Sequence, residues 1–308
     1  MLRRIFIFCY LYVIILALFI GLKPFIGIAQ TGEAQIGATQ PDASPTSAYR
    51  EEVKTSDQKP VQDDQTTRIP PYEIKGTSQQ LSKKNIQSIA EWKQQVQTFS
   101  DQYGNTVYIN GQTGEKMVAL TFDDGPDGQV TPAILDILKS YGGHASFFFT
   151  GQNVKTFPAI VRRAYQEGNL VLNHSYSHPN FDNKKPEFIK DEINKTGQLI
   201  ETLTGKIPAL VRPPYGIVNE NIIKIAKDQN FKLIIWSTDT FDWSHKDADH
   251  IANNVLQNIR PGEIVLMHSN GDKTQTQKAL PKIIEGLHAK GYKIVTLDYL
   301  LHVKAYKN

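Results

Sequence analysis

Residues 117–126, Met-Val-Ala-Leu-Thr-Phe-Asp-Asp-Gly-Pro, carry more information about the fold of this chain than any other stretch. Residues 117–122 form an apolar run of strand length, and the run ends at two adjacent carboxylates, Asp123 and Asp124. The Asp-Gly-Pro sequence alone would be explained by a turn. A turn does not need two carboxylates, however, and neighbouring residues on a strand point to opposite sides. One carboxylate can therefore bind a cation while the other stays free as a base.

Apolar runs of this kind recur through the C-terminal part of the chain. They lie at residues 117–122, 145–149, 170–172, 209–211, 233–236, 264–267 and 293–297. Helical patterns separate them, at residues 131–140, 158–167, 187–203, 219–229, 247–259 and 276–290. This alternation predicts an α/β fold, a parallel sheet covered by helices. Seven strands favour a shortened (β/α) barrel over an open doubly wound sheet, and no glycine-rich phosphate-binding motif follows a strand.

The composition is that of a globular protein without disulfide bonds. Of 308 residues, 40% are hydrophobic and 21% are charged, and a single cysteine is present, which excludes a disulfide framework and a cysteine-based zinc finger. The formal charge of +3 comes from Arg3, Arg4 and Lys23, because residues 1–29 contain no acidic residue. The remainder is formally neutral, so we expect no nucleic-acid partner.

The N-terminal segment is expected to direct export. Arg3 and Arg4 precede an apolar run at residues 5–22, and Gly27-Ile28-Ala29 offers small residues for a signal peptidase. We favour a cleaved signal peptide over residues 1–29, although a retained N-terminal anchor is also compatible with the length of the run. Both alternatives predict an extracellular or cell-envelope protein, and only an uncleaved segment would contact the membrane.

Residues 30–114 are predicted to contain a spacer followed by a small extension. Residues 30–80 are rich in Gln, Thr, Ser, Asp and Pro and show little apolar clustering, so we interpret them as a flexible spacer. The apolar spacing over 81–99 predicts an amphipathic helix packed on the flank of the main domain. Residues 107–109, followed by Asn110-Gly111, predict a hairpin. The main domain is expected at residues 115–304.

Two histidines indicate a metal site. His174-Ser-Tyr-Ser-His178 follows the strand predicted at 170–172. Histidines four residues apart lie on the same side of a helical turn and can reach one zinc ion. Two imidazoles and one of the two carboxylates would leave an open coordination position, which is typical of catalytic rather than structural zinc.

Three further strand ends carry polar residues. After 209–211, Arg212 can pair with a carboxylate in a bidentate manner, and the rigid Pro213-Pro214 step can aim the backbone N–H of Tyr215 at an oxyanion. A lone histidine, His268, ends the strand at 264–267, and a carboxylate from the preceding strand end would raise its pKa and make it a general acid.

The remaining strand end combines carboxylates with an aromatic residue. Trp243, beside Asp239 and Asp242, is suited to form a wall for a sugar ring or an acyl group. Trp236, which precedes them, is interpreted as a core residue.

Taken together, these elements make residues 115–300 similar to the polysaccharide deacetylase family, also called the NodB-homology or carbohydrate esterase family 4 domain. The matching motifs are TFDDGP at 121–126, HSYSH at 174–178, RPPYG at 212–216, DTFDW at 239–243 and LMH at 266–268, in the order of the family. The resemblance implies a distorted (β/α) barrel of about seven parallel strands and a metal-dependent hydrolase that removes N-acetyl groups.

The resemblance also implies a role for each residue of these motifs. The proton carriers would be Asp123 as base and His268 as acid, positioned by Arg212 and Asp242. The metal ligands would be Asp124, His174 and His178. The oxyanion would be bound by the backbone of Tyr215, and the substrate contacts would be Pro213, Tyr215, Asp239, Trp243 and Leu266.

The substrate expected for such an enzyme is the N-acetylglucosamine of cell-wall peptidoglycan. Export and the intact RPPYG motif favour it, while chitin oligomers, another poly-N-acetylglucosamine and acetylated xylan stay open. Zinc is the expected metal, with cobalt, manganese or nickel as alternatives for the same ligands. An inactive carbohydrate-binding module is the non-enzyme alternative, and the presence of both Asp123 and His268 argues against it.

Overall fold

The computed structural model describes residues 70–245 and 247–307. The predicted signal peptide or anchor and the first part of the predicted spacer therefore lie outside the described residues. Among the helices that the structure describes, none is both long enough and apolar enough to cross a membrane.

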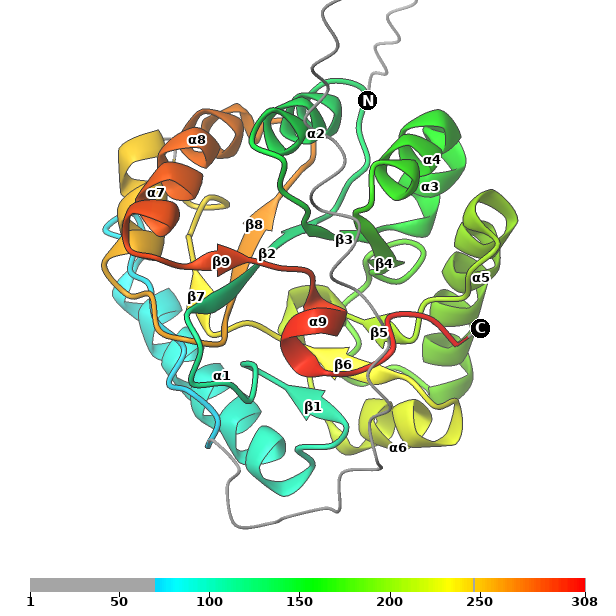
Figure 1. The fold of residues 1–308 in the computed structure, drawn as a ribbon. Coiled ribbons are helices and arrows are strands. Elements are labelled where there is room, and N and C mark those ends of the chain that lie inside the picture. The colour runs from blue at the N-terminus through cyan, green and yellow to red at the C-terminus, as the bar shows by residue number, and fades with distance from the viewer. Residues whose placement is uncertain (1–69, 246, 308) are drawn as a thin grey trace, which may run out of the picture. The chain divides into compact units, whose positions relative to one another are not determined.

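The fold is built on a curled parallel sheet whose central strand is β2, Met117–Asp123 (Figure 1). The strand order is β1-β6-β5-β4-β3-β2-β8-β7, β9 pairs with the start of β2, and every pairing between these strands is parallel. The other strands are β1 Val107–Tyr108, β3 Ser146–Phe149, β4 Leu170–Asn173, β5 Leu210–Val211, β6 Lys232–Ile234, β7 Thr238–Asp239, β8 Glu263–His268 and β9 Lys293–Ile294. The expected distorted (β/α) barrel is confirmed.

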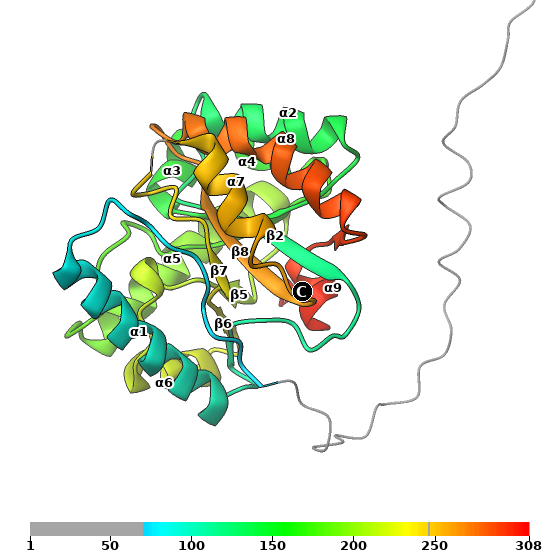
Figure 2. The ribbon, with the colours of Figure 1, turned by 90° about the vertical axis from the view of Figure 1, so that its left-hand side faces the viewer.

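Helices surround this sheet (Figures 1 and 2). They are α1 Lys83–Gln102, α2 Val130–Ser140, α3 Gly151–Thr156, α4 Pro158–Gln166, α5 Pro186–Thr204, α6 Glu220–Asp228, α7 Ala248–Leu256, α8 Thr274–Ala289 and α9 Leu297–Leu301. The strand expected at 293–297 is shorter than predicted, because Leu297 already begins α9.

The alternation of side chains along β2 positions the chemistry. Val118, Leu120 and Phe122 belong to the core cluster that contains residues of α2, α7 and α8, whereas Ala119 belongs to the other core cluster. Side chains alternate along a strand, so Asp123 lies on the same side as Ala119. The first carboxylate of the pair is thereby directed to the inner side of the curled sheet.

The hairpin predicted around Asn110-Gly111 is wrong. β1 pairs in parallel with β6 instead, and the N–H of Gly111 donates to the carbonyl of Gly262, 2.8 Å away. Val107 and Ile109 are each only 1% exposed. Their burial against the barrel explains the difference, because an independent hairpin would leave these apolar side chains in water.

Residues 72–78, here called the N-terminal strap, belong to the folded unit, whereas the sequence predicts a spacer up to residue 80. The N–H of Lys75 donates to the carbonyl of Ser237 (2.8 Å), and the carbonyl of Lys75 accepts from the N–H of Asp239 (2.9 Å). Ile74 is fully buried in the core. The strap extends the sheet beyond β7 and leads directly into α1, which lies beside α6 (Figure 2).

Candidate active site

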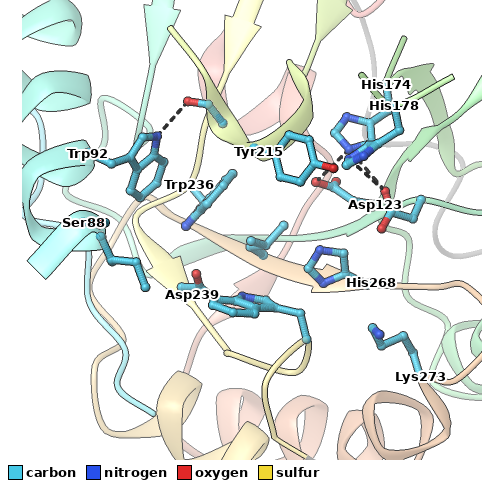
Figure 3. A pocket seen from close by; sticks show the side chains of 15 residues that line it. Ser88, Trp92, Asp123, His174, His178, Tyr215, Trp236, Asp239, His268 and Lys273 are labelled. Carbon is cyan, nitrogen blue, oxygen red and sulfur yellow. Dashed lines mark hydrogen bonds and ion pairs between the residues drawn. The ribbon is translucent and has the colours of Figure 1, made fainter. Parts of the chain in front are cut away.

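A cavity of about 430 Å³ opens where the strands end. Most of the sequence-predicted site residues line it (Figure 3). The predicted residues in its wall are Asp123, Asp124, His174, His178, Tyr215, Asp239, Trp243, Leu266 and His268. Two others, Arg212 and Asp242, are buried behind the wall and contact Asp123 and His268. Pro213 does not line the cavity.

Asp124, His174 and His178 converge on one point. One ligand atom from each lies within 4.8 Å of the other two. Oδ1 of Asp124 is 3.5 Å from Nε2 of His174 and 3.3 Å from Nε2 of His178, and this buried oxygen has no hydrogen-bond partner within residues 70–245 and 247–307. A buried carboxylate oxygen left unpaired between two imidazole nitrogens is the donor set of a divalent transition-metal site. The residues present therefore fit a divalent metal.

Neighbouring charges and burial set the protonation of these groups. Burial would lower the pKa of His174, but the Asp123 and Asp124 carboxylates outweigh it and raise the pKa. Nδ1 of His174 lies 2.7 Å from the carbonyl of Arg212, so the proton of the neutral ring is on Nδ1 and the lone pair of Nε2 faces Asp124. Burial, helped by the nearby His174, lowers the pKa of His178 to about 4. Burial would raise the pKa of Asp124, but the surrounding imidazoles, His174 above all, hold it well below its usual value.

The two histidines are not presented by a helical turn, contrary to the sequence-based expectation. Residues 174–178 form a loop in which Ser175 and His178 have positive φ angles of 63° and 55°. Glu192 of α5 holds this loop: its carboxylate accepts from the N–H groups of Tyr176 and Ser177 and from the Ser177 hydroxyl. Sequence reasoning missed Glu192, because nothing in a helical position 14 residues beyond His178 indicates this contact.

The backbone of Asp124 is also held by a side chain from another element. Its φ is 68°, a conformation that few non-glycine residues adopt, and its carbonyl accepts a 2.7 Å hydrogen bond from Nδ2 of Asn153 on α3. Asn153 was also missed, since α3 itself was not predicted.

Asp123 is paired with a fully buried arginine. Arg212 donates from one NH group to Oδ1 of Asp123 (2.7 Å) and to Oγ1 of Thr121 (2.8 Å). Its other donors reach the carbonyls of Ile234 and Ile235. The predicted bidentate pairing is therefore wrong: the carbonyls of Ile234 in β6 and of Ile235 directly after it occupy the rest of the guanidinium. Oδ2 of Asp123 is left facing His174, 3.7 Å away.

His268 forms the second polar pair. Its Nδ1 lies 2.7 Å from Oδ1 of Asp242, while Oδ2 of Asp242 accepts from the His268 N–H and from the hydroxyl of Thr276 on α8. Burial alone would lower the pKa of His268, but the Asp242 carboxylate outweighs it and raises the pKa to about 9. His268 is thus a protonated imidazole at neutral pH, with Nδ1 engaged by Asp242.

The aromatic wall has two sides. Tyr215 is 59% exposed, and its ring lies 4.7 Å from that of His178 in an edge-on arrangement. On the opposite side, the indole N–H of Trp243 donates to Oδ1 of Asp239 (3.3 Å). Burial raises the pKa of Asp239 to about 6.

Sequence reasoning missed several other residues of the wall. They are Ser88, Ile89 and Trp92 of α1, with Gly216, Trp236 and Lys273. Trp236 is both a core residue, as expected, and part of the cavity wall. A single tryptophan in an amphipathic helix gives no signal that it lies beside a site formed by residues more than 30 positions away.

Comparison with known proteins identifies the family. The sequence profile of the polysaccharide deacetylases matches residues 110–234. A peptidoglycan-N-acetylglucosamine deacetylase of Bacillus cereus is 45% identical over 191 residues, which make up 61% of this chain and 70% of the relative. The chain belongs to the polysaccharide deacetylase family. The resemblance drawn from the five motifs is confirmed, and the protein is an enzyme, a hydrolase of amide bonds.

Other polysaccharide deacetylases are similar in structure or sequence. A crystal structure of a peptidoglycan N-acetylglucosamine deacetylase, in complex with 4-naphthalen-1-yl-N-oxidanyl-benzamide, superposes with a TM-score of 0.66 at 40% identity and covers 68% of this chain and 98% of that chain. A peptidoglycan-N-acetylmuramic acid deacetylase of Bacillus subtilis is 36% identical over 222 residues, 72% of this chain and 45% of the relative.

Proposed function

We propose that this polysaccharide deacetylase hydrolyses the N-acetyl groups of N-acetylglucosamine residues in cell-wall peptidoglycan and releases acetate, with a divalent metal bound by Asp124, His174 and His178. The observation that carries the proposal is the convergence of these three ligand atoms within 4.8 Å, in one cavity with Asp123 and His268. Zinc is the metal we favour, because one carboxylate and two imidazoles are typical ligands of catalytic zinc.

A divalent metal in such a site supplies Lewis acidity, which polarises a carbonyl oxygen and lowers the pKa of water. The remaining chemistry is assigned to residues of the chain. Asp123 accepts the proton of the attacking water through Oδ2, because Oδ1 is held by Arg212 at 2.7 Å. The buried guanidinium keeps this carboxylate charged and fixes its orientation.

His268 is assigned as the general acid. An amide nitrogen leaves only when it is protonated, so a proton donor must lie on the side of the leaving group. Nδ1 of His268 is fixed by Asp242 at 2.7 Å, which leaves Nε2 to donate. The backbone N–H of Tyr215 is proposed to stabilise the oxyanion, and Leu266 and Trp243 to contact the acetyl methyl group, with Asp239 holding the indole of Trp243.

Peptidoglycan N-acetylglucosamine is favoured as the substrate because relatives with 45% and 38% identity carry that specificity in their names. The same residues would also serve on chitin oligomers, another poly-N-acetylglucosamine or acetylated xylan. An enzyme acting on peptidoglycan works in the cell envelope, which agrees with the export signal expected at residues 1–29.

The test is acetate release by the full chain from purified peptidoglycan, chitin oligomers and acetylxylan, measured side by side. We expect release from peptidoglycan to be fastest, to stop after treatment with a chelator and to return when ZnCl₂ is added. Fastest release from acetylxylan would overturn the substrate assignment, and release unaffected by chelator would overturn the metal assignment. Asp123→Asn and His268→Ala serve as catalytic negatives.

A further inference from the structure

The cavity extends beyond the proposed reacting residues to a wall made by α1. Ser88, Ile89 and Trp92 of this helix line the same cavity as Asp123 and His268. Figure 3 shows Ser88 and Trp92 at the α1 side of this cavity. Ser88 and Ile89 precede Trp92 by four and three residues, the spacings at which side chains of a helix are neighbours. None of them belongs to the motifs that identify the family.

Trp92 is fixed against the strand ends. Its indole N–H donates to the carbonyl of Gly216 (3.0 Å), and its ring lies 5.0 Å from the ring of Trp236. A side-chain carbon at Gly216, whose φ is 63°, would come within 2.7 Å of the Trp92 ring. The two indoles therefore form a rigid apolar surface immediately next to the Tyr215–Gly216 turn.

Polar groups accompany this apolar surface. Trp236 is only 6% exposed, and its buried Nε1 has no hydrogen-bond partner among the described residues. In Figure 3 this nitrogen points toward the side of the cavity on which Ser88 and Asp239 lie. A buried donor without an acceptor is costly unless a ligand supplies one. An N-acetylated sugar ring has a flat apolar face and, beside it, hydroxyl and acetamido oxygens that accept hydrogen bonds. The ring face would pack on the indoles, and an oxygen would accept the hydrogen bond of the Trp236 N–H.

We infer that the α1 end of the cavity, formed by Ser88, Ile89, Trp92 and Trp236, binds the sugar residue adjacent to the one that is deacetylated. The inference rests on the proposed function. It makes the enzyme selective for polymers, because a single N-acetylglucosamine occupying the reacting position would leave the aromatic surface of α1 without a contact.

The chain provides its own optical probe for this subsite. Its three tryptophans are Trp92, Trp236 and Trp243, and all three line the cavity. The tryptophan emission of the whole protein therefore reports on ligands in this cavity. Titration with N-acetylglucosamine oligomers, from the monosaccharide to the pentasaccharide, measures affinity at each length without requiring turnover.

The experiment compares kcat and KM for acetate release, and emission changes in the Asp123→Asn background, across these lengths. We expect kcat/KM of the wild type to rise at least tenfold on lengthening from the monosaccharide. Trp92→Ala should lose about tenfold of that gain through KM, the size expected for one aromatic contact. Trp92→Phe, which keeps a ring but loses the N–H, should retain most of it.

Ser88→Phe tests the same subsite by filling it with a larger side chain. Ser88 is exposed, so the variant should fold, and its added ring should raise KM for long oligomers only. Gln95→Phe is the matched control, at an exposed position of α1 outside the cavity wall, and should match the wild type.

Two results would overturn the subsite. One is a fall in kcat of Trp92→Ala that is equal for every oligomer length, and the other is a wild-type affinity that does not depend on oligomer length. No acetate from any oligomer or from peptidoglycan would instead overturn the proposed function, and the emission titration would still decide whether the subsite exists.

Discussion

At the scale of single residues, the site depends on two buried pairs in which one partner controls the other. Arg212 fixes one oxygen of Asp123 and leaves the second oxygen on the cavity side. Asp242 fixes Nδ1 of His268. In both pairs the controlling residue is fully buried behind the wall, where the low dielectric strengthens its effect.

The His268–Asp242 pair predicts a pH dependence. Asp242 raises the pKa of His268 to about 9, so the proton that the proposed mechanism takes from His268 is present at neutral pH and is lost as the pH rises through that value. In Asp242→Asn the carboxylate charge is gone and burial lowers the pKa of His268. The alkaline limb of the kcat/KM profile should move to lower pH by about one to two units, and activity at pH 8 should fall by roughly two- to tenfold as the protonated fraction of His268 decreases.

Thr276→Val is the control for this prediction. It removes one hydrogen bond to Asp242 but keeps the carboxylate, so the alkaline limb should move much less. An alkaline limb that stays in place in Asp242→Asn would mean that another group supplies the proton.

At the scale of elements, the geometry of the candidate metal site is maintained by a loop that a neighbouring helix holds. The loop from His174 to His178 contains two residues with positive φ, and conformations of this kind persist only when the surroundings enforce them. The buried carboxylate of Glu192 on α5 provides three hydrogen bonds to it.

Glu192→Gln should therefore weaken metal binding although Glu192 is not a ligand. The amide keeps the size of the side chain, but its NH₂ group cannot accept hydrogen bonds. We expect the dissociation constant for zinc, measured by competition with a chromogenic chelator, to rise by ~10–100-fold. Glu187→Gln, at an exposed position of the same helix, should bind zinc as the wild type does; an equal loss in both variants would contradict a specific role for Glu192.

At the scale of the whole molecule, the described fold includes residues that precede the first family motif by more than forty positions. The N-terminal strap pairs with β7 through Lys75, and the N–H of Tyr72 donates to the side chain of Asn110, just after β1. β1 and β7 are the two ends of the strand order. The strap thus links the two edges of the open barrel, and α1, which follows it, completes the cavity wall.

Ile74→Ala tests whether the strap contributes to the stability of the barrel. Ile74 is 1% exposed, and truncating a buried isoleucine to alanine typically costs ~2–5 kcal/mol. We expect the urea midpoint of the full chain to fall accordingly. Ile86→Ala, at a 51% exposed position of α1, should change the stability by less than ~0.5 kcal/mol. Equal midpoints for the two variants would restore the interpretation of residues 72–78 as spacer.

The sequence by itself determined the parallel α/β fold and predicted most of the residues that the structure brings together in the candidate site. Apolar runs such as 117–122 and 264–267 define strands through local periodicity, and the polar residues that end them meet at one edge because parallel strands share a direction. Only the tertiary structure decided how Arg212 divides its donors between Asp123 and the carbonyls at the end of β6, that a loop held by Glu192 presents the histidines, and that the strap and Trp92 complete the barrel and its cavity. These features depend on contacts between residues far apart in the chain, and such contacts are set by how the elements pack, a property that no local pattern of residues encodes.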